Sequence, residues 1–286
     1  MSIKKPNNFS FSLLNINTLT DSKLVDLNNL TSENHITFMT ETNISNKSHE
    51  NVIRSDETYT WKMIDVDYNK NQRSRVAIKF PSYLEKFIKV SIIQNNLYEN
   101  PERVQKDKTI IQSLFMSLQL WQYKFKTVLV YRVPDADNFL SDSEQTDKLF
   151  QSIENFKPDF VLGDFNIDYN KLQNKQKISS ISSLKQIITK FTRIGPSRSG
   201  LSKTIIDHIY VKHSLVKKFK YDVKDVCFSD HKIINFSIDA NVPKIHIRIK
   251  QKVDKFRRYF PKNIDWTNFP LYFDPEAYSN YDTDGY

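Results

Sequence analysis

Short apolar segments separated by polar turns run through most of this chain, and they predict β-strands more often than helices. The expected strands cover residues 9–15, 36–42, 58–66, 74–80, 86–93, 110–120, 125–133, 160–166, 204–211, 223–227 and 233–238. Apolar residues at helical spacing predict helices within residues 20–33, 137–156 and 177–191, with Phe191 in the core. Many short strands with few helices between them favour two packed β-sheets flanked by helices over a doubly wound parallel sheet.

The strand expected at residues 160–166 carries a carboxylate and an amide at its end. Asp164 and Asn166 are two residues apart, so on a strand they share one face and project together. A buried carboxylate is costly unless it is paired or its pKa shifts. The two residues therefore either begin an ordinary turn, as Asp and Asn often do, or belong to a functional site.

Other polar residues stand at the ends of apolar runs in the same way. They are Asn15, Glu41, Tyr131 with Arg132, Asp207, and Asp230 with His231. Ligands collect at one rim of a scaffold, so polar groups at several strand ends are typical of an active site. Asn15 and Glu41 flank a strand–helix–strand unit, whose right-handed crossover brings both strand ends to one edge. Each residue taken alone also has an ordinary structural role as a turn cap, strand end or satisfied pair.

The residue types suit the hydrolysis of phosphoesters. Glu41 can hold Mg²⁺, and Asp164 can orient or deprotonate a water molecule. Asp207 shares one strand face with Ile209 and Val211, so it is expected to point inward and to need a partner. It can fix the tautomer of His231 and raise the pKa of that ring. His208 faces the opposite side of that strand and is expected to be structural. Hydrogen bonds to phosphoryl oxygens can come from Asn15, Asn166 and Tyr131.

Composition narrows the function further. The chain has 286 residues and a net charge of +9, which favours nucleic acid or another polyanion as partner but also describes a lysine-rich soluble protein. The single cysteine, Cys227, excludes a disulfide scaffold and a cysteine zinc cluster, and it fits a reducing compartment. We found no signal-like segment and no apolar run of membrane-spanning length, so we expect an intracellular protein that is neither secreted nor membrane-bound.

The pattern changes after about residue 240. Basic residues crowd the stretch 244–262, and an acidic, tyrosine-rich end follows. We expect a domain boundary here, with residues 1–240 forming one domain and residues 241–286 a C-terminal extension or connector. A basic run of this kind is usually a solvated tail, and the alternative is contact with DNA phosphates.

A series of motifs in this order resembles the endonuclease/exonuclease/phosphatase superfamily. The motifs are LNIN (14–17), TET (40–42), VYRVP (130–134), LGDFNID (162–168), IDHIYV (206–211) and SDH (229–231). More narrowly, they resemble the apurinic-endonuclease-like domain of non-LTR retrotransposons, as does the stretch 184–210. Residues 244–273 resemble the connector to a reverse transcriptase. The chain departs from the usual pattern at Arg73-Ser74-Arg75, where the family has a glycine-rich turn, and at Val133 before a single Pro134.

The resemblance implies a DNase I-like fold, an α+β sandwich of four layers, and a Mg²⁺-dependent endonuclease that nicks DNA, with Mn²⁺ as an alternative metal. It implies metal binding by Glu41, with Asn15 and Asp230 beside the metal. It implies catalysis by Tyr131 at the scissile phosphate, Asp164 and Asn166 at the attacking water, and Asp207 paired with His231. It assigns Arg132, Ser229 and Arg198 to substrate binding.

Other readings of the same fold remain open at this point. One is a catalytically silent module that binds nucleic acid or serves a structural role, and another is a phosphoesterase that acts on RNA or a phospholipid. The expected partners of the preferred reading are DNA and a reverse transcriptase in cis or in trans. Nuclear residence follows from the DNA substrate.

Overall fold

The computed structural model describes residues 2–3, 8–55, 57–100, 107–134, 140–171, 183–197, 200–239 and 247–248. The chain divides into two units, one of residues 6–242 and one of residues 1–5 with 243–286. In the latter, β1 (Ser2–Ile3) pairs antiparallel with β16 (Ile247–Arg248). The functional division into a nuclease domain and a connector stays a prediction.

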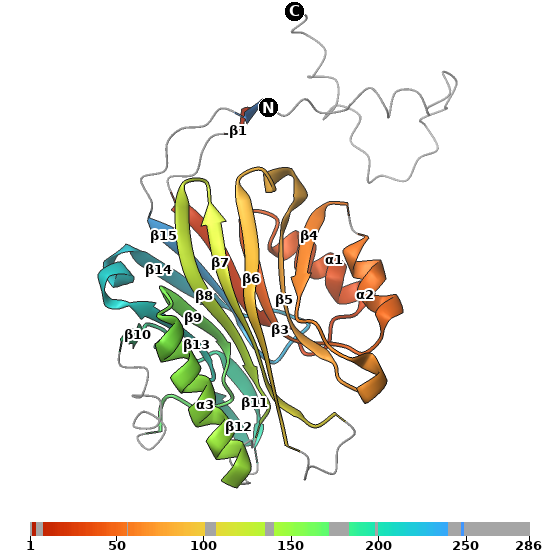
Figure 1. The fold of residues 1–286 in the computed structure, drawn as a ribbon. Coiled ribbons are helices and arrows are strands. Elements are labelled where there is room, and N and C mark those ends of the chain that lie inside the picture. Colours follow the sequence, from red (N-terminus) through yellow and green to blue (C-terminus); the bar gives the residue numbers. More distant parts are fainter. Residues whose placement is uncertain are drawn as a thin grey trace, which may run out of the picture. The chain divides into compact units, whose positions relative to one another are not determined.

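Two mixed β-sheets of six strands each form the larger unit within the described residues, and a separate hairpin accompanies them (Figure 1). The first sheet has the order β14 (Phe219–Lys224), β15 (Ile233–Asp239), β2 (Asn8–Asn15), β3 (Ile36–Ile44), β5 (Ser74–Pro81), β4 (Tyr59–Met63). The second has the order β10 (Leu184–Gln186), β13 (Asp207–Lys212), β9 (Phe160–Asp164), β8 (Tyr123–Arg132), β7 (Thr109–Leu120), β6 (Ile88–Glu99). The hairpin is β11 (Arg193–Ser197) with β12 (Gly200–Thr204).

Each sheet contains one parallel strand pair at its centre, joined through a helix. In the first sheet β2 runs parallel to β3 through α1 (Asp21–Leu30), and in the second β8 runs parallel to β9 through α3 (Leu140–Phe156). The remaining strand pairs in both sheets are antiparallel. Parallel strands end at the same edge of a sheet, so each pair brings its two carboxyl ends together.

Aromatic side chains fill the space between the sheets. Phe11 stacks on Phe236 with ring centres 5.0 Å apart, and Phe160 of the opposite sheet lies 6.2 Å from Phe11. Each of these rings is at most 3% exposed. Full burial of a phenylalanine stabilises the fold by roughly 1.5–3 kcal/mol, so this contact holds the two sheets together.

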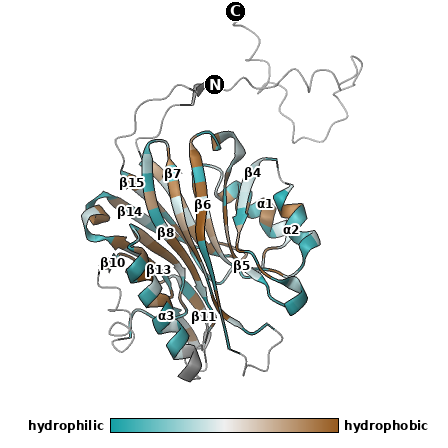
Figure 2. Ribbon diagram, viewed as in Figure 1, coloured by the Kyte–Doolittle hydropathy of each residue, from teal (hydrophilic) through white to brown (hydrophobic). Residues whose placement is uncertain are grey.

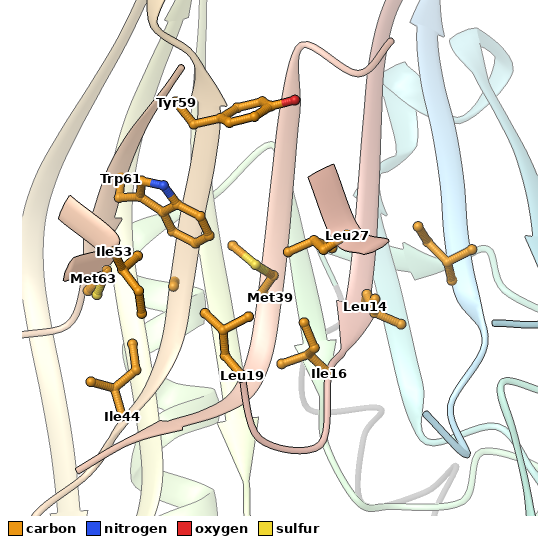
Figure 3. Packing of buried hydrophobic residues seen from close by; sticks show 12 residues of the cluster. Leu14, Ile16, Leu19, Leu27, Met39, Ile44, Ile53, Tyr59, Trp61 and Met63 are labelled. Atoms are coloured by element: carbon orange, nitrogen blue, oxygen red, sulfur yellow. The ribbon is translucent and has the colours of Figure 1, made fainter. Parts of the chain in front are cut away.

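Helices cover the outer faces of both sheets. On the first sheet, α1 and α2 (Lys47–Arg54) bury Leu27 and Ile53 against outward residues of β2 to β5, among them Met39 and Trp61 (Figure 3). On the second, Phe150 of α3 stacks on Phe165. Figure 2 shows that hydrophobic residues predominate on the strands, whereas the helices carry both hydrophilic and hydrophobic residues. The order helix, sheet, sheet, helix confirms the predicted four-layered sandwich.

Short 3₁₀ helices complete the larger unit at η1 (Tyr68–Lys70), η2 (Ser82–Leu84) and η3 (His213–Lys218). None of the helices in the described part of the chain is both long and apolar enough to cross a membrane.

The structure corrects several expected elements. Of the helix expected at 177–191, residues 177–182 lie outside the described ones, and the remainder holds the strand β10 rather than a helix. Phe191, expected in the core, is 44% exposed. The strand expected at 223–227 begins and ends earlier, as β14, because its residues pair with β15. The strand expected at 86–93 extends to Glu99 because β7 pairs along its length.

Candidate active site

The carboxyl ends of the two central parallel pairs meet across the sandwich. Asn15 ends β2 and Asp164 ends β9, and the Asn15 Nδ2 donates a hydrogen bond to Asp164 Oδ2 at 2.8 Å. The same Nδ2 donates to Glu41 Oε2 at 2.8 Å, and the Tyr131 hydroxyl donates to Glu41 Oε1 at 3.4 Å. The structure therefore brings together polar residues that the sequence placed at separate strand ends.

Glu41 reaches this cluster because its strand is irregular. In β3, Phe38 faces the inner aromatic core and Met39 the outer cluster, so strict alternation would turn Glu41 outward with Met39. The pairing with β5 shifts register between Thr40 and Ile44, and Glu41 takes a left-handed backbone conformation with φ of 54°. A bulge of this kind re-aims a side chain, and it directs the carboxylate inward.

Asp164 is fully buried and accepts hydrogen bonds at both carboxylate oxygens. Besides Asn15, the Asn166 backbone N–H donates to Oδ1 at 2.9 Å and the Asn166 Nδ2 to Oδ2 at 3.1 Å. Asn166 lies in a turn after β9 with φ of 49°, so it meets Asp164 through this turn rather than along a strand. Burial raises the pKa of Asp164, and the neighbouring Asp207 raises it further.

Asp207 and His231 form a buried pair beside Asp164. Asp207 is opposite Asp164 in the antiparallel pairing of β13 with β9, so both carboxylates face inward. The His231 Nδ1–H donates to Asp207 Oδ2 at 2.8 Å, which leaves Nε2 free to serve the cluster. Burial lowers the pKa of His231, but the Asp207 carboxylate outweighs it and, with Asp164 and Asp230, raises this pKa to about 9.

Ser229 links the loop that carries His231 to strand β2. Its hydroxyl donates to the carbonyl oxygen of Asn15 at 2.8 Å and accepts the backbone N–H of His231 at 3.2 Å. Ser229 therefore supports the loop and fixes Asn15 and His231 relative to each other.

The cluster contains a group suited to a metal ion. One ligand atom each from Glu41, Asp164 and His231 lies within 4.8 Å of the others. Asp207 Oδ1 is also buried here, and it has no hydrogen-bond partner among the described residues. Acceptor oxygens in excess of the available donors call for a cation, and carboxylate oxygens are the ligands that hard divalent cations take. The residues thus fit a metal.

Some of the predicted site residues lie elsewhere. Arg132 follows Tyr131 in β8 and so faces the opposite side of the sheet, where it is 1% exposed and donates through Nε to Thr146 of α3. This position corrects the prediction of a substrate contact. Asp230 is ion-paired with Arg193 at 2.7 Å, and its charge still reaches His231; its role beside the metal stays a prediction. Arg198 lies outside the described residues.

Two residues of the site were missed by the sequence analysis. Thr192 is fully buried; its Oγ1 accepts the N–H groups of Ile206 and Asp207, and its carbonyl accepts that of Lys232. It therefore positions both sides of the Asp207–His231 pair. Lys23 donates to the carbonyls of Ile16 and Asn17 in the loop after Asn15. Neither residue stands at the end of an apolar run, so the pattern gave no signal for it.

His208 confirms the structural role that alternation predicted. It is buried on the outer face of β13, where it stacks on Phe165 and accepts a hydrogen bond at Nδ1 from the Tyr210 hydroxyl at 2.8 Å. Its Nε2–H donates to the carbonyl of Ile205. Burial lowers the pKa of His208 to about 4, so it is neutral and lies outside the acidic cluster.

Comparison with known proteins bears on the fold. No protein-family model and no curated protein matches the chain. Among solved structures, the endonuclease domain of TRAS1, a telomere-specific non-LTR retrotransposon, matches with a TM-score of 0.54 and 12% identity over 81% of this chain and 99% of that one. TDP2 from D. rerio, complexed with a single-strand DNA product, matches with a TM-score of 0.57 and 11% identity, over 82% of this chain and 100% of that one.

A third solved structure is an endonuclease/exonuclease/phosphatase family protein from Bacteroides thetaiotaomicron. It matches with a TM-score of 0.51 and 12% identity over 82% of this chain and all of that one. At these identities the likeness is one of fold. The chain has the DNase I-like fold of the endonuclease/exonuclease/phosphatase proteins, as the sequence motifs implied.

Proposed function

We propose that the chain is a Mg²⁺-dependent phosphodiesterase that nicks DNA. The observation that carries this proposal is the convergence of Glu41, Asp164 and His231 within 4.8 Å, at the edge where both parallel strand pairs end. Left-handed backbone at Glu41 and Asn166 adds support, because strained backbone clusters at functional sites.

Glu41 would hold the ion, and Asp164 and the protonated His231 would lie beside it rather than act as its ligands. Mg²⁺ is usually bound by one or two carboxylates together with substrate phosphate oxygens and water. When bound, it would supply stabilisation of the negative charge that develops on the phosphate and the leaving oxygen.

Asp164 is suited to orient the attacking water and accept its proton. Its three hydrogen bonds from Asn15 and Asn166 hold the carboxylate in one orientation. A general base works best when its pKa lies near the working pH, and burial raises this pKa from its ordinary range.

His231 is suited to stabilise the phosphate as a cation. Asp207 binds Nδ1–H and so fixes which nitrogen faces the site, as an orienting carboxylate does. With a pKa near 9, the imidazolium is present at neutral pH and can neutralise phosphate charge or protonate the leaving oxygen.

Tyr131 completes the proposed phosphate site as a neutral donor. Burial, with the nearby Glu41 carboxylate, raises the pKa of its phenol, so the hydroxyl keeps its proton at neutral pH. A preorganised donor of this kind favours the charge of the transition state over that of the substrate.

DNA is the preferred substrate for two reasons. The net charge of +9 favours a polyanion, and the matching solved structures include a retrotransposon endonuclease domain and TDP2 with a single-strand DNA product. Nuclear residence and association with a reverse transcriptase belong to the same proposal. The fold alone also accommodates cleavage of RNA or a phospholipid.

Labelled oligonucleotides test the proposal. Duplex DNA, single-stranded DNA and RNA of one sequence are incubated with the protein in Mg²⁺ or EDTA, beside a short-chain phosphoinositide. We expect Mg²⁺-dependent cleavage of DNA that falls by at least about a hundredfold in Glu41→Gln and His231→Asn. His213→Asn is the matched control, because His213 is exposed in η3.

Other outcomes assign a different function. Preferred cleavage of RNA or lipid by the same residues changes the substrate class. Tight DNA binding without any Mg²⁺-dependent product identifies a silent binding module and contradicts the proposed activity.

A further inference from the structure

Arg75 places a buried cation beside the candidate site. It lies near the start of β5 and is 9% exposed. Its Nη2 donates to Asp107 Oδ2 at 2.7 Å, and its Nη1 to the carbonyl of Thr109 at 3.4 Å. Because Asp107 balances its charge and the side chain is enclosed, the guanidinium is fixed in place and is not available to a DNA phosphate.

The guanidinium lies over the ring of Tyr131. Its central carbon is 5.5 Å from the ring centre, within the range of a cation–π interaction. The hydroxyl at the far end of the same ring donates to Glu41. Arg75 therefore contacts the face of the residue whose hydroxyl enters the acidic cluster.

Gln112 ties the same segment to the strand next to Tyr131. Gln112 is opposite Tyr131 in the pairing of β7 with β8. Its Oε1 accepts the backbone N–H of Arg75 at 2.8 Å, and its Nε2 donates to the carbonyl of Arg73. β5 and β7 belong to different sheets, so these bonds join the two sheets beside the ring.

We propose that Arg75, held by Asp107 and Gln112, is a positioning residue that sets the orientation of the Tyr131 ring and hydroxyl. The inference rests on the proposed function of the site. A small displacement of a catalytic donor costs one to two orders of magnitude in rate, so loss of Arg75 lowers turnover rather than substrate binding.

A double-mutant cycle tests this role through turnover. We expect Arg75→Gln to lower kcat for DNA nicking about tenfold with KM changed less than about threefold, and Arg75→Lys to recover part of the loss. In a Tyr131→Phe background, which lacks the hydroxyl, Arg75→Gln has no further effect. Arg73→Gln, an exposed neighbour on the same segment, is the control. Equal losses from Arg75→Gln in both backgrounds overturn the proposal.

A second measurement needs no activity. The protein is labelled with 3-fluorotyrosine, and the ¹⁹F resonance of Tyr131 is identified by its absence in Tyr131→Phe. We expect this resonance to shift and broaden in Arg75→Gln, or in Arg75→Lys if the first variant does not fold, and to stay in place in Arg73→Gln. An unchanged resonance contradicts the proposal. A shifted resonance in a protein that cleaves nothing keeps the positioning role and removes the proposed function.

Discussion

At the scale of single residues, two groups of the site, Asp164 and His231, hold their protons more tightly in the folded chain than in the unfolded one. Asp164 and Asp207 are opposite each other on paired strands. His231 donates a hydrogen bond to Asp207, and its positive charge also acts on Asp164. Burial and the neighbouring carboxylate raise the pKa of Asp164, and the carboxylates outweigh burial to raise that of His231 to about 9. Proton binding and folding are therefore linked at this site.

The stability of the metal-free protein is expected to fall as the pH rises. The folded pKa of His231 is near 9 and its ordinary value is 6.5, so its stabilisation is complete below pH 6.5 and lost toward pH 9. The raised pKa of Asp164 acts in the same direction. We expect a loss of about 1–3 kcal/mol over this range in urea unfolding with EDTA.

Asp207→Asn is the companion variant for this prediction. Without the Asp207 carboxylate, burial is opposed only by the charges of Asp164 and Asp230. The pKa of His231 then falls, and the pH dependence between 6.5 and 9 flattens. NMR titration of the His231 ring reports its pKa directly. A ring that titrates near 6.5 in the wild-type protein contradicts the assigned pair.

Polar residues at the ends of apolar runs predicted most members of this cluster. They did not predict how the backbone directs each side chain into it. The inward direction of the Glu41 side chain depends on a bulge, and nothing in the preceding residues 36–39 indicates that bulge. Arg132 was predicted beside Tyr131, although adjacent strand residues face opposite sides. Thr192 acts through backbone contacts to residues distant in sequence, and such contacts depend on the tertiary fold.

At the scale of elements, β9 depends on its glycine. Gly163 has φ of 146°, and a Cβ at this position would lie 1.9 Å from the carbonyl oxygen of Val130 in the paired strand β8. Backbone cannot move aside as a flexible side chain can. The next pair in this register is Tyr131 with Asp164, so close approach of β8 and β9 at the glycine also sets the site.

Gly163→Ala is expected to destabilise the protein by about 3 kcal/mol or more and to reduce cleavage, because the strands must separate. Gly195→Ala is the matched control: the nearest atom to its added Cβ is 3.6 Å away in the flexible side chain of Arg193. We expect a change within about 1 kcal/mol there. Urea unfolding compares the two, and equal stabilities would contradict the close packing of β8 on β9.

Periodicity was misleading where tertiary pairing decided the structure. The apolar spacing of residues 177–191 fits a helix, yet residues 184–186 pair with β13 as an edge strand. Phe191 follows this strand and is largely exposed. A short apolar run fits either structure, and pairing with a distant strand, which the local sequence does not encode, selected the extended form.

At the scale of the whole molecule, the two-sheet sandwich was predictable from the number of short strands, but the strand order was not. Each sheet assembles strands from distant parts of the chain, such as β15 beside β2. The equivalent placement of the two parallel pairs brings Asn15 and Glu41 of one sheet toward Tyr131 and Asp164 of the other. The site therefore exists only when both sheets are complete.

The basic run at 244–262 is either a solvated tail or a contact for DNA phosphates, and only the second would add affinity for DNA, without sequence preference. Substitution of Lys252, Lys255, Arg257 and Arg258 by glutamine in the full chain removes four positive charges. Each lost phosphate contact lowers the slope of log affinity against log salt by about 0.9 for duplex DNA. Binding titrations over a range of salt measure the slope, and an unchanged slope identifies the run as a solvated tail.

Nicking of supercoiled plasmid shows whether this acidic cluster cleaves DNA. The purified chain and Asp164→Ala are each incubated with plasmid in Mg²⁺ and in EDTA, after circular dichroism has shown that both are folded. We expect conversion to open circle by the wild-type protein in Mg²⁺, and none in EDTA or with Asp164→Ala. Equal nicking by the variant would contradict the assigned site, and no nicking by the folded wild-type protein would contradict the proposed DNA endonuclease.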